Sequence, residues 1–187
     1  FTSTSASCVT GLVVYDTLTQ WSLFGQIVIL CLIQIGGIGI ITLAMYFLSM
    51  LHAKIGMRHV FALQESIGAE SSAGLVKMTR FIAAGVLLQE AVGAILLLPV
   101  FIPQFGLGRG IWYAVFHSVS AFCNAGFDIL GSEGAPFASL MPYAANAALN
   151  IPIMLLIVLG GIGFPVWNEF IGRKNKQRLS IYTRFVL

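Results

Sequence analysis

Three long stretches of this chain contain at most one charged side chain. Residues 17–51 and 134–168 hold no Asp, Glu, Lys or Arg, and residues 81–102 hold only Glu90. Each stretch exceeds the roughly 20 residues that a helix needs to cross a bilayer. A signal peptide has an apolar core of only about 7–15 residues and lies at the N-terminus. The sequence therefore predicts an all-α integral membrane protein with several spans.

The few charges that the chain does carry indicate its topology. Only 9% of its residues are charged, against about 25% in soluble domains. Basic residues collect on the cytoplasmic side of a membrane, which places residues 52–80 and 172–181 inside and residues 99–110 outside. A basic cluster can also bind nucleic acid, but topology already accounts for these residues and we expect no nucleic-acid partner. The clustered residues are Lys54, Arg58, Lys77, Arg80, Arg173, Lys174, Lys176, Arg178 and Arg184.

One twelve-residue segment occurs twice. FTSTSASCVTGL at residues 1–12 and FHSVSAFCNAGF at residues 116–127 are identical at six positions. A second pair, QIGGIGI at 34–40 and LGGIGFP at 159–165, follows in the same order. The two copies of the second motif lie further apart in the sequence than those of the first, which fits an insertion in the connection at 128–142. Two landmarks in the same order, with one insertion between them, indicate a structural repeat.

Each repeat unit contains the motif, a short polar connection, a long apolar helix, a glycine-rich break and a basic end. Residues 21–51 and 79–100 form two full spans between the motifs, so both motifs lie on the outer side and the repeats are parallel. Two crossings return the chain to the side on which it started, and this even number of spans argues against an inverted-repeat transporter. Residues 108–122 have helical capacity but are too short to span. We therefore expect them to form a half-helix that enters the membrane from outside.

The residues that follow each half-helix are expected to line a cation path. Irregular backbone at membrane depth is tolerated only where it is buried in protein or lines a water-filled path. These residues offer carbonyl oxygens, which replace an ion's hydration shell, and their glycines can turn a carbonyl toward an axis. The C-terminal end of the half-helix is partly negative. Asp16, Asp128 and Glu133 would raise the cation concentration at the outer mouth. The predicted filter residues are Cys8, Val9, Thr10, Gly11, Cys123, Asn124, Ala125 and Gly126.

The glycine-rich breaks have two interpretations that the sequence leaves open. Small residues allow close packing of helices in membranes. The same residues could form a hinge that is used in gating. A phosphate-binding loop is a poor third alternative, because the motif lies inside an uncharged run with no preceding soluble strand. The glycines are Gly36, Gly37, Gly39, Gly160, Gly161 and Gly163.

Few other residues are candidates for a catalytic, metal-binding or ion-binding role. Glu90 lies within a predicted span, where an ionisable residue is a functional candidate by default, although a structural role as partner to another polar or basic group is the favoured interpretation. The three cysteines form no CxxC pair and do not indicate a metal cluster. An intramembrane protease would need a Ser/His pair, paired Asp residues or a metal motif in the spans. None of these is present, so we expect no enzyme activity.

The chain resembles the membrane (pore) subunit of Ktr-type potassium uptake systems, within the Trk/Ktr/HKT superfamily of cation transporters. The resemblance rests on SCVTGLVVYDT, LIQIGGIGIIT, FHSVSAFCNAGFDI and MLLIVLGGIGFPVWNE with the basic segment after it, and it covers essentially the whole chain. It implies four repeats of helix, re-entrant pore loop and helix around a pseudo-fourfold pore, so this chain would be part of a longer polypeptide.

The resemblance also implies how the chain divides. Its parts would be the end of the first pore loop with the inner helix of repeat 1, a cytoplasmic connection, repeat 2, and a cytoplasmic basic segment with the start of repeat 3. Within repeat 2, the pore helix and filter would be followed by an inner helix. The first two parts are residues 1–51 and 52–78. Repeat 2 is residues 79–171, with its pore helix and filter at 108–127 and its inner helix at 141–171. The last part is residues 172–187.

The implied function is potassium uptake across the plasma membrane, in bacteria the inner membrane, by a multi-pass protein. Potassium would bind the filter carbonyls of Gly11 and Gly126, and no covalent cofactor is implied. Plant relatives that select sodium have serine at the first of these positions, whereas both are glycine here. The resemblance further implies a homodimer, a cytoplasmic nucleotide-binding regulatory ring and, in some members, sodium dependence. The alternative is a sodium-conducting or poorly selective member of the superfamily.

Overall fold

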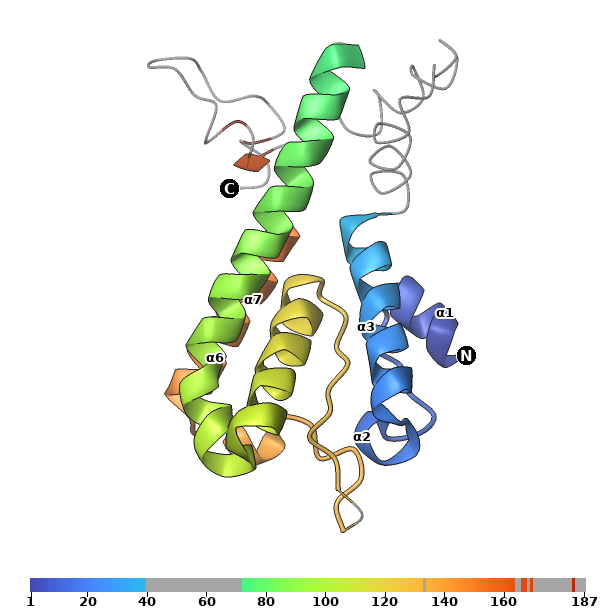
Figure 1. The fold of residues 1–187 in the computed structure, drawn as a ribbon, viewed down its shortest axis with the longest axis vertical. Helices are drawn as coiled ribbons and strands as arrows, with labels where there is room; N and C mark the ends of the chain where they lie inside the picture. The colour runs from blue at the N-terminus through green and yellow to red at the C-terminus, as the bar shows by residue number, and fades with distance from the viewer. Residues whose placement is uncertain (40–71, 133, 164–165, 168, 170–182, 184–187) are drawn as a thin grey trace. The chain divides into compact units, whose positions relative to one another are not determined.

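A computed structural model gives the fold of the chain (Figure 1). It divides into two compact units, which are Phe1–Gly37 with Leu87–Gly161, and Ile38–Val86 with Ile162–Leu187. Most of the predicted cytoplasmic connection and nearly all of the predicted basic segment lie outside the described residues. The structure describes residues 1–39, 72–132, 134–163, 166–167, 169 and 183.

The described residues are mostly helical, in agreement with the predicted all-α class. Within these ranges there is no strand, and the only β pairing is an isolated bridge between Ser132 and Ala135. A short 3-10 turn lies between the last two helices. In chain order the helical elements are α1 (Thr2–Ser7), α2 (Thr17–Gln20), α3 (Leu23–Ile38), α6 (Ser72–Phe122), the 3-10 turn at Met141–Tyr143 and α7 (Ala147–Ile162).

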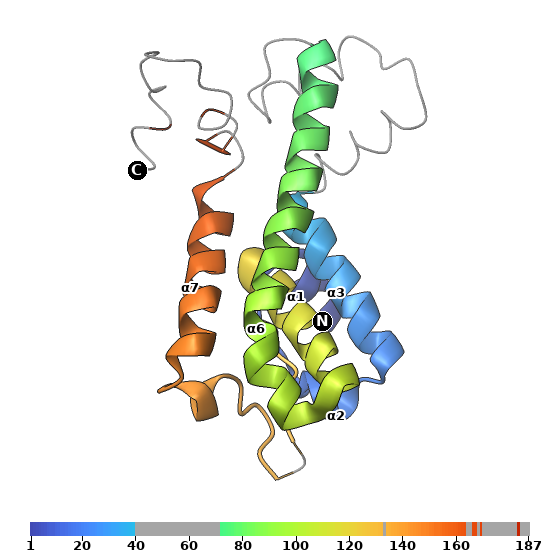
Figure 2. The same cartoon turned by 60° about the vertical axis from the view of Figure 1, so that its left-hand side comes forward.

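Helix α6 consists of two stretches that run in opposite directions. Gly106 has φ 77° and ψ 172°, which no helical residue adopts, and the chain reverses there. Gly110 lets the two stretches approach closely, because a Cβ atom at that position would lie 2.8 Å from the Cα of Ile102. Figures 1 and 2 show the part after the break (yellow) running back beside the part before it (green). Residues 107–122 are called the return segment below.

The return segment is the centre of the first unit. Every residue from 116 to 123 is buried. The three polar side chains among them, those of His117, Ser118 and Ser120, each bond to a backbone carbonyl oxygen, as buried polar groups require. Fully buried side chains from three further stretches complete this core, namely Ile33 on α3, Leu97 and Phe101 on α6, and Leu149 on α7. The return segment covers the half-helix expected at 108–122, and its entry into a membrane stays a prediction.

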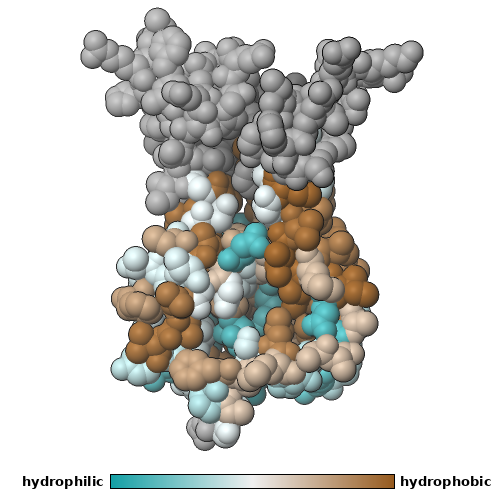
Figure 3. Space-filling model, turned by 180° about the vertical axis from the view of Figure 1, so that it is seen from behind, coloured by the Kyte–Doolittle hydropathy of each residue, from teal (hydrophilic) through white to brown (hydrophobic). Residues whose placement is uncertain are grey.

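The outer faces of the first unit are apolar as well. Large apolar side chains on three helices are at least 40% exposed, among them Phe24 on α3, Leu88 on α6 and Met154 on α7. Figure 3 shows apolar flanks (brown) on either side of a hollow in which hydrophilic residues (teal) are visible. Among the described residues, Phe81–Phe122 meets the length and composition of a membrane-crossing helix, and the break at Gly106 divides this range into two stretches that run in opposite directions. Apolar side chains both inside and outside are what a bilayer requires of a spanning protein.

Helices α3 and α7 end at the same point of the glycine-rich motif. Each has 16 residues and stops at the isoleucine before the third glycine, at Ile38 and Ile162. The glycines that follow, Gly39 and Gly163, have φ of 86° and 88°. At about 1.5 Å per residue each helix is about 24 Å long. The rest of the longer apolar runs predicted here, residues 40–51 and most of 164–171, lies outside the described residues.

Candidate functional site

The two copies of the repeated segment end in the same backbone turn. The first turn (residues 8–11) follows α1, and the second turn (residues 123–126) follows the return segment. One hydrogen bond across five residues and one across three define the Schellman ending of an α-helix. Both turns have this pair and one further bond in the same register. The bonds are Cys8 N to Thr4 O (2.9 Å), Val9 N to Ala6 O (3.2 Å) and Thr10 N to Ser5 O (3.0 Å), and then Cys123 N to Val119 O (2.9 Å), Asn124 N to Ala121 O (3.1 Å) and Ala125 N to Ser120 O (2.8 Å).

Left-handed backbone also occurs at matched positions in the two turns. Val9 and Asn124 have φ of 50° and 56°, and two residues later Gly11 and Gly126 have φ of 72° and 71°. Asparagine tolerates this region, whereas a β-branched residue rarely enters it, so the backbone at Val9 is strained. Glycine adopts such angles without a steric penalty. Glycine at the last position of each turn is therefore a requirement of the backbone.

The two turns lie against each other although they are far apart in the sequence. A Cβ atom on Gly11 would lie 2.6 Å from the carbonyl oxygen of Ala125 and 3.2 Å from the Cα of Gly126. A Cβ atom on Gly126 would lie 3.5 Å from the Cα of Gly11. The backbones of the predicted filter residues thus come together, and the space at Gly11 is closed to any side chain.

Serine hydroxyls support both turns, and the residues predicted from the sequence for this site did not include these serines. Ser5 Oγ lies 2.9 Å from Thr10 Oγ1, within the first turn. Ser120 Oγ donates to the carbonyl oxygen of Phe127 at 2.6 Å, directly after the second turn. Serine at the same position of both copies was the available signal. The hydroxyl partners differ because Thr10 is replaced by Ala125 in the second copy.

The glycine-rich motifs pack directly on these turns. A Cβ atom on Gly36 would overlap the carbonyl oxygen of Ser7, and one on Gly160 would overlap that of Phe122. Each carbonyl belongs to the last helical residue before the turn of the same repeat. Gly37 lies against the side chain of Cys123, which belongs to the other repeat. These contacts favour the packing interpretation, and the hinge stays a prediction.

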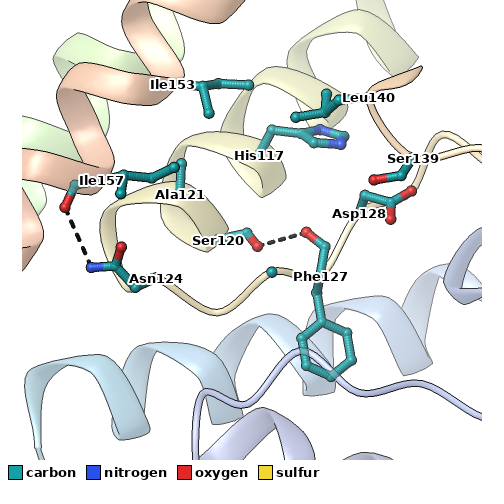
Figure 4. A pocket seen from close by; sticks show the side chains of 11 residues that line it. His117, Ser120, Ala121, Asn124, Phe127, Asp128, Ser139, Leu140, Ile153 and Ile157 are labelled. Atoms are coloured by element: carbon teal, nitrogen blue, oxygen red, sulfur yellow. Dashed lines mark hydrogen bonds between the residues drawn. The ribbon is translucent and has the colours of Figure 1, made fainter. Parts of the chain in front are cut away.

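A cavity of about 240 Å³ lies behind the second turn (Figure 4). Asn124 closes one side of it by donating from Nδ2 to the carbonyl oxygen of Ile157 on α7 at 3.4 Å. The His117 ring is buried, and its Nδ1 lies 2.7 Å from the Tyr113 carbonyl oxygen. Within the part of the chain that the structure describes, His117 Nε2 has no hydrogen-bond partner. The first copy of the repeated segment has Thr2 in place of this histidine.

The two aspartates expected at the outer mouth have different surroundings. Asp16 is buried; its Oδ1 accepts from the backbone of Leu18 and Thr19, and its Oδ2 accepts from Phe137 N at 3.0 Å. Burial acts to raise the pKa of Asp16, but these hydrogen bonds outweigh it and hold the pKa below its usual range. Asp128 is half-buried, and within the described ranges its carboxylate accepts from the nearby Leu130 N at 3.1 Å. Attraction of cations by either carboxylate stays a prediction.

No ligand set for a resident metal is found in the described ranges, where three His, Cys, Asp or Glu side chains never lie together. Besides backbone carbonyls, the two turns contain one hydroxyl (Thr10), one side-chain amide (Asn124) and two thiols (Cys8 and Cys123). The oxygens among these groups suit a weakly held monovalent cation.

Residues 1–186 match the TrkH family, described as a cation transport protein. The chain belongs to the TrkH family. The resemblance drawn from the repeated motifs is thereby confirmed. Since this is a family of membrane transport proteins, the chain is part of a membrane protein.

Relatives with assigned names agree with this membership. The chain is 36% identical over 187 residues to the potassium/sodium uptake protein NtpJ of Enterococcus hirae. It is 35% identical to the Ktr system potassium uptake protein B of Bacillus subtilis over 187 residues and to that of Vibrio alginolyticus over 191. The alignments cover 100% of this chain but only 40%, 41% and 40% of those relatives. The chain thus spans about two fifths of their length.

Proposed function

We propose that the protein takes up potassium through a path lined by backbone carbonyls of the two turns. The observation that carries the proposal is the matched pair of turns, which share three hydrogen bonds and two left-handed positions and meet at Gly11 and Gly126. A backbone conserved in this detail, while Val9 is replaced by Asn124 and Thr10 by Ala125, indicates that the carbonyl positions matter more than the side chains.

The surroundings of the turns favour a cation. Neither turn contains a basic residue, and α1 and the return segment each point their partly negative C-terminal ends at a turn. Carbonyl oxygens replace the hydration shell of potassium in selectivity filters. We propose Gly11 and Gly126 as the carbonyl ligands nearest the ion, with Asp16 and Asp128 adding negative potential on the outer side.

Potassium is preferred over sodium in this proposal because both filter positions are glycine. Two of the relatives compared above carry the name of potassium uptake proteins, and the third is named for both potassium and sodium. That third name supports the second candidate, a carrier of both ions or of sodium alone. The two candidates share the same site and differ only in its discrimination.

Ion flux into proteoliposomes that contain the full-length protein tests the proposal. With potassium or sodium supplied alone, we expect potassium to enter faster. A sodium flux above the potassium flux would establish the second candidate instead. A Gly126→Ser protein is expected to lose much of its preference for potassium, since a side chain is forced onto a residue with φ 71°. An unchanged preference in that variant would show that the second turn is not the filter.

The assembly is proposed on a different basis. Two of the relatives are named as parts of Ktr systems, which supports a protein that works with further components. We propose a homodimer of the full-length membrane protein bound to a cytoplasmic nucleotide-binding ring. Light scattering of the purified complex in detergent would give its mass, and a mass equal to one membrane chain alone would contradict the proposal.

A further inference from the structure

Glu90 connects three parts of the first unit that are distant in the sequence. It lies on the first stretch of α6 and is 6% exposed. The side-chain amide of Gln34 on α3 donates to both of its carboxylate oxygens, at 2.8 Å and 3.0 Å. The thiol of Cys123, the first residue of the second turn, donates to Oε1 at 3.8 Å. One carboxylate therefore holds a helix of one repeat and the turn of the other.

The backbone around Glu90 is fixed to the return segment. Ser118 Oγ donates to the carbonyl oxygen of Glu90 at 2.6 Å. One turn further along α6, a Cβ atom on Gly93 would lie 2.5 Å from Ser118 Oγ and 2.6 Å from Leu156 Cδ1. The part of α6 that carries Glu90 cannot move without moving the return segment, because the Ser118 hydroxyl bonds to Glu90 and packs closely on Gly93.

Among the described residues, Gln34 and Cys123 are the hydrogen-bond partners of the Glu90 carboxylate. A cavity of about 390 Å³ beside it is lined almost entirely by apolar groups. Apolar cavities of this kind do not supply the polar partners that an ordered water needs. A buried carboxylate depends on hydrogen bonds to offset its desolvation, so Gln34 and Cys123 are strongly required as donors. The apolar lining of the cavity includes Leu30, Leu87, Ala94, Val115 and Val119.

The contact with Cys123 lies next to the point where the glycine-rich motif touches the same turn. Gly37 packs on the Cys123 side chain, and Gln34 stands one helical turn before Gly37 on α3. The hydrogen bond between Gln34 and Glu90 therefore sets how closely α3 approaches the second turn. A small displacement there would move the carbonyls that follow Cys123.

We propose that Glu90 is a positioning residue that fixes the second turn against α3 through Cys123 and Gln34, and so sets the discrimination between monovalent cations. This inference rests on the proposed function of the two turns as a filter. Glu90 itself need not touch the ion. Its effect is transmitted through the position of the Cys123 backbone.

The test uses the full-length protein in proteoliposomes, with KM measured separately for potassium and for sodium. In Glu90→Ala we expect the ratio of the two KM values to change by about five- to tenfold. Gln34→Ala should change it in the same direction but less. The double variant should be no worse than Glu90→Ala, because residues that act through one interaction are not additive. Glu90→Gln keeps an acceptor for the Gln34 amide, so its ratio of KM values should stay close to that of the wild type.

Leu88→Ala is the matched control, because Leu88 lies on the same helix and its side chain is 65% exposed. It should leave the ratio unchanged. A purely structural role for Glu90 would lower the yield of folded protein and the maximal rate but not the ratio. If Glu90→Ala does not fold, Gln34→Ala and Glu90→Gln still test the proposal. A wild-type ratio of the two KM values in Gln34→Ala would overturn it.

Gly126→Ser separates this inference from the proposed function. If Gly126→Ser alters the ratio while Glu90→Ala and Gln34→Ala do not, the turns form the filter and Glu90 does not position it. If Gly126→Ser leaves the ratio unchanged, the proposed filter itself fails, and any effect of Glu90 must arise elsewhere.

Discussion

The first and second turns share a backbone but differ in what supports it. In the first turn, Ser5 and Thr10 pair within the segment and Cys8 is exposed. In the second, Ser120 bonds to Phe127 within the segment, and further support comes from outside it, through the contact of Cys123 with Glu90 and that of Asn124 with Ile157. Identical backbone hydrogen bonds with different side-chain support show that the carbonyl geometry is the common property of the two copies. The second turn is therefore more sensitive to changes in distant helices.

The largest expected effect concerns the glycine that touches each turn. In Gly160→Ala, the new methyl group would overlap the backbone carbonyl of Phe122. We expect a loss of about 3 kcal/mol in the free energy of unfolding, at the upper end for overpacking. Thermal unfolding of the full-length protein in detergent measures it. Gly108→Ala is the control, because nothing lies within 4 Å of a Cβ atom there. Equal stability of the two variants would contradict the close packing.

Asp16 links the loop after the first turn to the loop after the second, whereas the bond that Asp128 accepts among the described residues comes from Leu130, two residues away. Asp16→Ala leaves the amides of Leu18, Thr19 and Phe137 without their acceptor. We expect a loss of about 2 kcal/mol, which is typical of a lost helix cap with one further contact. Asp128→Ala should cost clearly less in the same unfolding experiment. A larger effect at Asp128 would reverse the comparison.

The contribution of Asp16 should depend on pH in a defined direction. Its folded-state pKa lies below the unfolded value of about 3.9, so its stabilisation is complete above that pH and is lost as the pH falls through the folded value. Wild-type protein should lose stability in this acid range, and Asp16→Ala should lose less. If stability fell with pH to the same extent in the two proteins, Asp16 would not be responsible for the loss.

Exchanging the left-handed residues tests whether the turns are equivalent. Asn124→Val should destabilise the second turn by about 1–2 kcal/mol, since a β-branched residue would be placed at φ 56°. Val9→Asn should stabilise the first turn by about the same amount. The two changes in the unfolding midpoint are thus expected to have opposite signs. Changes of the same sign would mean that the two turns do not share this conformation.

The smallest difference is expected at the supporting serines. Ser120→Ala removes the 2.6 Å hydrogen bond to Phe127 and should cost about 1 kcal/mol. Ser5→Ala should cost less, because Thr10 Oγ1 also lies 3.3 Å from the Ser5 carbonyl oxygen and can keep that bond. The difference is small but measurable from unfolding midpoints. A greater loss at Ser5 would show that the first turn depends more on its hydroxyls.

Sequence alone could predict the features that depend on local pattern. The repeated segment indicated a helix followed by a turn with glycine at Gly11 and Gly126, and glycine is what the backbone needs there. The all-α class and the family followed from apolar runs and motifs. Contacts across more than a hundred residues could not be predicted in this way. The bond from Phe137 to Asp16, and the meeting of Gly11 with Ala125, depend on how the helices pack.

Glu90 shows the same limit at a single residue. The sequence marked it as an unusual carboxylate within an apolar span, but could not choose between a functional and a structural role. The choice depends on its partners, Gln34 and Cys123, which lie 56 and 33 residues away. Only the packing of α3 against α6 brings these side chains together.

Anomalous scattering from a heavier potassium substitute tests the central claim most directly. Crystals of the full-length protein grown with rubidium or thallium(I) should show an anomalous peak in contact with the carbonyl oxygens of Gly11 and Gly126. The peak should weaken when sodium replaces these ions. An ordered ion that lies elsewhere in the protein, with no peak at the two turns, would contradict their assignment as the filter.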